Sequence, residues 1–228
     1  MILHYHCYGN YPIATESYYR KEGVMPKVTE VERELFKEAA AELDFIGINY
    51  YHTNVCEYNP LDGAQRFGHA NTTGEKGSDE VTGVPGLYKN PPNPYLRTTD
   101  WDWGIDPDGL RYACRMLTSR YHRPIVISEN GLGAFDEFEN GCIHDDYRIE
   151  YLRQHVRAVE QAVADGCDVL SYCVWSFTDL LSWLNGYQKR YGLVYVDRGE
   201  DEGGSLKRYR KDSFYWYKRV IESNGKVL

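Results

Sequence analysis

Three short, strongly apolar runs, each preceded by a helical pattern, constrain what this chain can fold into. The runs place β-branched and aromatic residues at consecutive positions, which is typical of strands covered on both faces. Helix followed by strand, three times over, is the β/α pattern of a parallel sheet or barrel, so we predict an α/β fold. The predicted strands span residues 44–51, 124–130 and 168–176, and the helices before them span 29–42, 107–121 and 145–165.

Two further regions lie outside these helix–strand units, one between the first and second strands and one after the third. Residues 59–99 are polar and rich in Gly, Pro, Asn and Thr. They are either a structureless linker or, because long loops in compact domains usually carry function, an excursion over the mouth of an active site. After the third strand the pattern predicts a β-ribbon of residues 193–196 with 206–209, and a final helix over 213–223.

Charge and cysteine usage exclude several classes of partner. The formal net charge of −8 and the pI near 5.4 argue against nucleic acid and anionic membrane surfaces. We expect no membrane span, because no apolar run has the necessary length, and no secretory signal at the start. The six cysteines contain no C-x-x-C pair, so we expect reduced thiols in the cytoplasm. The histidines show no ligand spacing, and we predict neither a metal nor a cofactor.

Glu129 is the first candidate for chemistry. It ends the apolar strand 124–130 and is followed by Asn130 and Gly131. A carboxylate at such a place is costly to desolvate unless it is used or hydrogen-bonded. In β/α barrels the carboxyl ends of the strands form the active-site face. A structural glutamate that caps the following loop is the alternative.

Three motifs, in one order along the chain, resemble those of glycoside hydrolase family 1. Ser128-Glu129-Asn130-Gly131 after an Ile/Val strand is similar to the nucleophile motif of that family. Residues 44–51 resemble its sixth strand, and residues 175–192 resemble the signature around its eighth strand. The resemblance covers essentially the whole chain and implies the C-terminal half of a (β/α)₈ TIM barrel, roughly strands six to eight with their helices, as one partial domain over residues 1–228.

The resemblance also implies roles for individual residues. Glu129 is the nucleophile, Tyr51 donates a hydrogen bond that orients it, and Asn49 lies near the catalytic centre. Trp175 forms the floor beneath the sugar ring, and Trp183 contacts sugar hydroxyls. These roles suit a retaining glycosidase, which needs an ionised carboxylate aimed at the anomeric carbon and a second carboxyl as acid and base.

Ser182 indicates the substrate class. Ordinary members of the family have a glutamate at this position, and a glutamate would repel a 6-phosphate that carries about −1.5 to −2 charges. Here the matching positions hold Ser182, Lys189 and Tyr191, which correspond to the phosphate ligands of the 6-phospho-β-glycosidases. One cation with two neutral donors suits a phosphate dianion. A solvated lysine in a turn is the alternative.

Trp101 is a further candidate, for the leaving-group side. The phospho-glycosidases have a tryptophan near this position that lines the aglycone site, and the chain has Trp101 and Trp103 there. Packing of the indoles in the interior is the alternative reading for both residues.

One catalytic element of the family does not occur in the sequence. The acid/base glutamate lies in an Asn-Glu-Pro tripeptide, which this chain lacks. We therefore expect a fragment, inactive alone, whose exposed strand edges favour aggregation or association with a missing N-terminal half or with other copies in a homo-oligomer. The implied reaction is retaining hydrolysis of 6-phospho-β-D-glucosides, with 6-phospho-β-D-galactosides as possible further substrates. A non-catalytic relic that at most binds phosphorylated sugars is the alternative.

Overall fold

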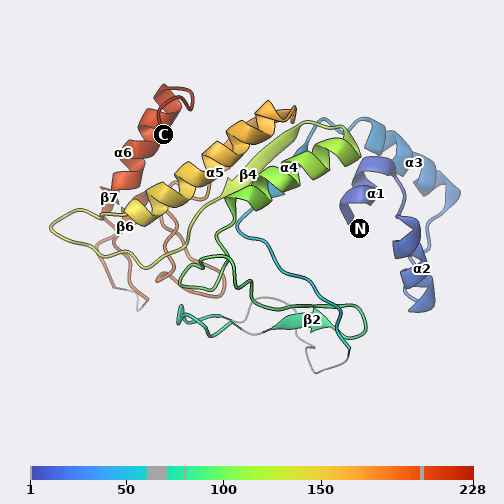
Figure 1. Cartoon of the computed structure of the whole chain (residues 1–228), viewed down its shortest axis with the longest axis horizontal. Helices are drawn as coiled ribbons and strands as arrows, with labels where there is room; N and C mark the ends of the chain where they lie inside the picture. The colour runs from blue at the N-terminus through green and yellow to red at the C-terminus, as the bar shows by residue number, and fades with distance from the viewer. Residues whose placement is uncertain (1, 61–70, 80, 201–202) are drawn as a thin grey trace.

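The computed structural model of the chain describes residues 2–60, 71–79, 81–200 and 203–228 (Figure 1). At its centre lies a three-stranded parallel sheet in the order β1-β4-β5. These strands are β1 (Ile46–Asn49), β4 (Ile125–Asn130) and β5 (Val169–Val174), and each falls inside a predicted strand. The prediction of an α/β fold with parallel strands is therefore confirmed.

Helices cover one face of this sheet. Helices α4 (Pro107–Tyr121) and α5 (Asp146–Ala164) pack against each other and lie beside β4 (Figure 1). Leu110 and Cys114 of α4 meet Ile125 and Ile127 of β4 in the main hydrophobic cluster, and all four side chains are fully buried. Helix α3 (Glu30–Ala41) precedes β1, and α1 (Ile2–Tyr8) packs against α3; α2 (Ile13–Lys21) lies between them in the sequence.

The predicted helix ends follow from capping residues. Thr29 and Glu32 form the reciprocal capping box that the Thr-x-x-Glu pattern indicates, which satisfies backbone donors at the start of α3. Asp106 accepts a hydrogen bond from the Gly109 amide at the start of α4, with a proline at the first helical position. The predicted helices before the second and third strands begin and end within one residue of the observed ones, although no side chain caps the start of α5.

The expectation that the strands are covered on both faces is wrong for β1 and β5. Leu170 of β5 is 58% exposed, Phe45 just before β1 is 47% exposed, and Cys173 is also exposed. Among the described residues, both strands are edges of the sheet, and the helices reach one of its faces. The apolar residues on the opposite face therefore have too few neighbours within the described part of the chain.

Two antiparallel ribbons complete the structure. β2 (Thr82–Val84) pairs with β3 (Tyr88–Asn90) inside the polar stretch of residues 59–99, of which 61–70 and 80 lie outside the described residues. The predicted ribbon after the third strand is present as β6 (Val194–Val196) paired with β7 (Arg208–Arg210). Helix α6 (Asp212–Glu222) follows it and packs on α5, as a second hydrophobic cluster shows.

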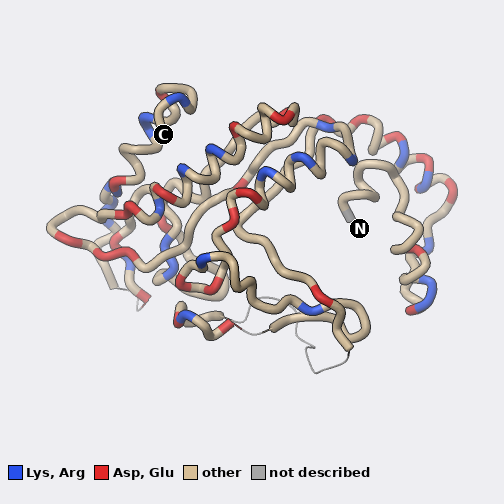
Figure 2. Tube along the Cα trace, viewed as in Figure 1, with Lys and Arg blue, Asp and Glu red and all other residues tan. Residues whose placement is uncertain are grey.

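Charged residues of both signs are mixed along the helices. Figure 2 shows Lys and Arg interspersed with Asp and Glu on α3 and α5, whereas on α4 the charged residues after its first turn are all Arg. Among the described residues, no helix combines the length and the apolar character that crossing a membrane requires.

Candidate active site

The carboxyl ends of the three parallel strands bring most of the predicted residues together. Asn49 ends β1, Glu129 is the second-last residue of β4, and Trp175 directly follows β5. Because the strands are parallel, these ends meet at one edge of the sheet, and Asn49 pairs with Glu129 in the register. A pocket of about 380 Å³ opens at this edge, and its lining includes every predicted site residue except Trp101.

Tyr51 holds the Glu129 carboxylate. Its hydroxyl donates a hydrogen bond of 2.6 Å to Glu129 Oε2. Burial, followed by the hydrogen bond to Glu129, raises the pKa of Tyr51 well above its ordinary value. The phenol therefore stays protonated at any physiological pH and remains a donor to the carboxylate.

The backbone of Glu129 is fixed by Asn130, a residue whose role the sequence did not reveal. The fully buried Asn130 amide donates to the Tyr50 carbonyl at 2.7 Å, and the Tyr172 hydroxyl donates to Asn130 Oδ1 at 2.5 Å. The Tyr50 amide in turn donates to the Glu129 carbonyl at 2.9 Å. Asn130 thus joins the three strands directly behind Glu129. A buried asparagine inside an apolar strand was the available signal, because such an amide needs partners.

Gly131 allows the segment after β4 to lie close to the Trp175 backbone. A Cβ atom at this position would lie 1.7 Å from the carbonyl oxygen of Trp175. No side chain fits there without moving the segment that carries Trp175. The glycine after Asn130 is therefore required by space, and it keeps the predicted sugar platform beside Glu129.

Lys189 brings a buried cation to the same pocket. The side chain is 1% exposed, and its Nζ lies 3.7 Å from the centroid of the Trp103 ring and 4.9 Å from that of Trp101. Among the described residues, no carboxylate forms an ion pair with it. Burial lowers the pKa of Lys189 to about 7. The indoles supply only part of the stabilisation that a desolvated ammonium needs, so the site favours an incoming anion.

Tyr191 lies next to this amine, and Ser182 lines the same pocket. Tyr191 is buried, and its ring centroid lies 5.6 Å from Lys189 Nζ. Burial raises the pKa of Tyr191, an effect that a hydrogen bond from Ser182 partly offsets. Gly133 makes room for both long side chains, because a Cβ there would lie 2.6 Å from a carbon of Lys189 and 2.8 Å from one of Tyr191. The predicted phosphate ligands are therefore adjacent, and all are neutral or cationic.

The two predicted sugar-contacting indoles differ in how they are held. Trp175 is half-buried, whereas Trp183 is 99% exposed and projects from the loop that also carries Ser182. Leu181 and Leu184 on either side of Trp183 are exposed as well. This loop therefore forms an apolar rim of the pocket. No described residue covers this rim.

The prediction that Trp101 contacts the aglycone does not agree with its position. Trp101 is completely buried and packs on Phe135 with ring centroids 4.7 Å apart, so it has no surface to offer a ligand. Trp103 lines the pocket instead, and its ring lies edge-on to that of Tyr51 at 5.5 Å. The two indoles share a sequence pattern, but only their burial distinguishes the ligand-facing one.

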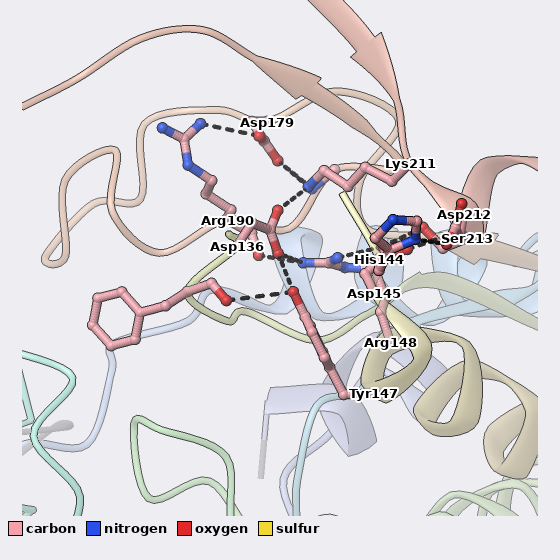
Figure 3. A network of polar contacts seen from close by, with 12 residues as sticks. Asp136, His144, Asp145, Tyr147, Arg148, Asp179, Arg190, Lys211, Asp212 and Ser213 are labelled. Atoms are coloured by element: carbon pink, nitrogen blue, oxygen red, sulfur yellow. Dashed lines mark hydrogen bonds and ion pairs between the residues drawn. The ribbon is translucent and has the colours of Figure 1, made fainter. Parts of the chain in front are cut away.

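A buried ionic network anchors Arg190, the residue after Lys189 (Figure 3). Lys211, directly before α6, donates to Asp179 at 2.8 Å and also to Asp136. Arg190, next to Lys189, pairs with Asp179 at 3.1 Å. The network continues through Arg148, which pairs with Asp136 at 3.0 Å and with Asp145 at 2.5 Å. Because these charges are desolvated and paired, the loops after β4 and β5 are held in one arrangement.

Comparisons with known proteins agree with this architecture. The family model described as glycosyl hydrolase family 1 matches residues 1–226. An aryl-phospho-β-D-glucosidase of Bacillus subtilis is 52% identical over 226 residues, and a 6-phospho-β-glucosidase of Escherichia coli is 41% identical over 222 residues. These matches cover 99% and 96% of this chain but 47% and 43% of the relatives.

A solved structure extends the agreement to three dimensions. A family 1 β-glucosidase of Thermotoga maritima superposes with a TM-score of 0.76 at 28% identity, over 97% of this chain and 43% of that one. The described fold is therefore part of a (β/α)₈ barrel, and the chain spans under half the length of the relatives it matches. A family model that matches nearly the whole chain identifies it as a member of glycosyl hydrolase family 1.

Proposed function

We propose that this chain supplies the nucleophile and phosphate-binding half of an enzyme that hydrolyses 6-phospho-β-D-glucosides with retention of configuration. One observation carries the proposal: a single pocket contains both the Glu129 carboxylate, held by Tyr51, and the buried Lys189 amine. A sugar that occupies this pocket places its anomeric carbon near Glu129 and its 6-phosphate near Lys189. The two named bacterial relatives bear phospho-glucosidase names, which supports a glucoside over a galactoside.

The reaction uses two displacements. A Glu129 oxygen attacks the anomeric carbon as the bond to the aglycone oxygen breaks, and a carboxylic acid outside this chain protonates that oxygen. The same carboxyl, now ionised, removes a proton from water, which attacks the anomeric carbon and releases Glu129. Tyr51 keeps the attacking oxygen oriented through its 2.6 Å hydrogen bond, and the Trp175 indole covers the apolar face of the ring.

The resemblance to family 1 also supports a proposal for which strands of the barrel this chain contains. We propose that β1, β4 and β5 are the sixth, seventh and eighth strands of the barrel and that a polypeptide carrying the preceding strands completes it. The exposed edges of β1 and β5 are consistent with such a partner. We also propose a cytoplasmic location, because reduced thiols and a phosphorylated substrate belong to that compartment.

Replacement of Lys189 tests the phosphate assignment. The experiment uses a hybrid protein in which the unmatched part of the Bacillus subtilis relative is fused before this chain. In the hybrid, Lys189→Met should lower kcat/KM for nitrophenyl 6-phospho-β-glucoside by about 10- to 100-fold, because a charge-assisted hydrogen bond contributes roughly 1.5–3 kcal/mol. The rate on the unphosphorylated glucoside should not fall.

Two further variants sharpen this test. Lys207→Met changes an exposed lysine of the same chain and should leave both rates unchanged. Ser182→Glu should shift preference toward the unphosphorylated sugar, since a carboxylate there repels the dianion. Equal loss on both substrates in Lys189→Met would show that Lys189 has a structural role and would contradict the phosphate assignment.

The lowered pKa of Lys189 predicts a pH dependence. In the empty pocket the amine is charged below about pH 7 and neutral above it, while the substrate phosphate is a dianion above about pH 6. Tyr51 and Tyr191, which face the same pocket, stay neutral because their pKa values are raised. The ratio of kcat/KM for the phosphorylated to the unphosphorylated substrate should therefore fall roughly tenfold between pH 7 and 8.5. Taking the ratio cancels every pH effect that the two substrates share, and the ratio should be flat in Lys189→Met.

A further inference from the structure

Three side chains that ligate metals lie together away from the pocket. Cys142 and His144 come from the loop between β4 and α5, and Asp212 is the first residue of α6. One ligand atom from each, the thiol sulfur, a ring nitrogen and a carboxylate oxygen, lies within 4.8 Å of the others. None of the three lines the pocket that holds Glu129.

The backbone around this cluster places the side chains on one side. Ile143 is fully buried, whereas Cys142 on one side of it is partly exposed and His144 on the other side is exposed. The Cys142 and Glu139 backbones exchange two hydrogen bonds of 2.9 Å, and the Asp212 amide donates to the Ile143 carbonyl at 3.2 Å. Asp212 is thereby fixed beside the midpoint of the Cys142–His144 pair.

The donor set suits a divalent cation of intermediate softness. Zinc accepts thiolate, imidazole and carboxylate ligands together, and a thiolate and a carboxylate neutralise its charge. Glu139 and Asp146 add negative charge around His144. This charge offsets the repulsion between a cation and the positive end of the α6 dipole. The cationic Lys211 next to Asp212 is already paired with Asp136 and Asp179.

The distances between the three ligand atoms need only a small adjustment to fit a zinc ion. In a tetrahedral zinc site the ligand atoms lie about 3.3–3.7 Å apart. Cys142 Sγ lies 3.7 Å from Asp212 Oδ1, while His144 Nδ1 hydrogen-bonds Asp212 Oδ2 at 2.6 Å and must move outward by about 1 Å. The His144 side chain is 64% exposed, so it has room to turn outward when its hydrogen bond to Asp212 is exchanged for a bond to the ion. A water molecule would complete a tetrahedral set of ligands.

We propose that Cys142, His144 and Asp212 form a binding site for a zinc ion. The ion joins the loop after β4 to the start of α6, next to the ionic network of Figure 3, and therefore strengthens the attachment of the C-terminal helix. The role is structural and lies outside the proposed hydrolysis. The sequence did not predict these ligands, because Asp212 is remote from Cys142 and His144 in the chain and the three residues form no short motif.

Cobalt(II) titration of the chain tests the site. Cobalt replaces zinc in such sites and gives an intense charge-transfer absorption when a cysteine thiolate binds it. We expect this band to saturate at a single ion per chain, to disappear when zinc is added, and to be absent in Cys142→Ser. The matched control Cys56→Ser removes an exposed thiol elsewhere and should keep the band. His144→Ala should weaken binding roughly 10-fold or more.

Other outcomes would overturn the proposal. Absence of the band in the unmodified chain, or its persistence in Cys142→Ser, would leave a hydrogen-bonded His144–Asp212 pair beside an unrelated thiol. The hybrid protein contains the same residues, so the titration can be repeated there if the chain alone does not stay in solution. Because the readout is metal binding, it is independent of whether Glu129 and Lys189 act as proposed.

Discussion

Tested alone, this chain should hydrolyse no 6-phospho-β-glycoside at a measurable rate, whereas the hybrid protein should turn it over. The chain contains no Asn-Glu-Pro tripeptide, so the carboxyl that protonates the leaving oxygen must come from elsewhere. A general acid alone contributes about 10²–10⁴-fold to such a reaction. Unpaired edges on β1 and β5 and exposed apolar residues such as Leu170 should also make the isolated chain aggregate, dimerise or remain partly molten.

Steady-state kinetics and size-exclusion chromatography of the same samples check this prediction. The release of nitrophenol from the 6-phospho-glucoside is compared between the chain, the hybrid and the unmatched part of the relative alone. A monomeric chain with a sharp thermal transition and clear turnover would falsify the incomplete-barrel proposal. An inactive hybrid that folds cooperatively would favour the alternative of a non-catalytic, sugar-phosphate-binding relic.

Glu129→Gln in the hybrid should lower kcat by roughly 10⁴-fold or more, because the neutral amide cannot form the glycosyl-enzyme. The amide can still accept a hydrogen bond from Tyr51, which donates at 2.6 Å to Glu129 in the unmodified chain. The fold and the substrate affinity should therefore be nearly preserved. Mass spectrometry of peptides after reaction with a 2-fluoro 6-phospho-glycoside should find the label on Glu129 and none in the variant.

Glu137→Gln is the matched control for this substitution. Glu137 is an exposed carboxylate eight positions further along the same segment, and its replacement should leave labelling and turnover intact. Labelling of a residue other than Glu129, or turnover within tenfold of the unmodified hybrid in Glu129→Gln, would remove Glu129 from the nucleophile role.

The repeating elements were predictable because local signals agreed with the tertiary structure. The capping box at Thr29, the proline that starts α4 and the β-branched run before Glu129 each specify their element from neighbouring residues. The sequence did not predict α1, α2 or the β2–β3 ribbon. Their stability depends on contacts with distant segments, such as α1 against α3, that no local pattern records.

The sequence predicted most residues that line the site, but it did not predict the residues that hold them in place. The family resemblance pointed to the residues at the strand ends, and these line one pocket. It pointed to Trp101, whereas Trp103 lines the pocket, because both indoles occur in one polar segment and only packing decides which is covered. The role of Asn130 likewise depends on Tyr50, directly after β1, and on Tyr172 of β5, which become its partners only in the folded sheet.

The buried network of Figure 3 makes the last residues of the chain matter for a loop far from them in sequence. A gene that stops just before Lys211 would still encode every proposed substrate ligand. Its product would bury Asp136 and Asp179 with one fewer positive charge to compensate them, at a cost of several kcal/mol. Such a gene would still contain every family motif, although the loop that carries Lys189 would no longer be tied to the segment that leads into α6.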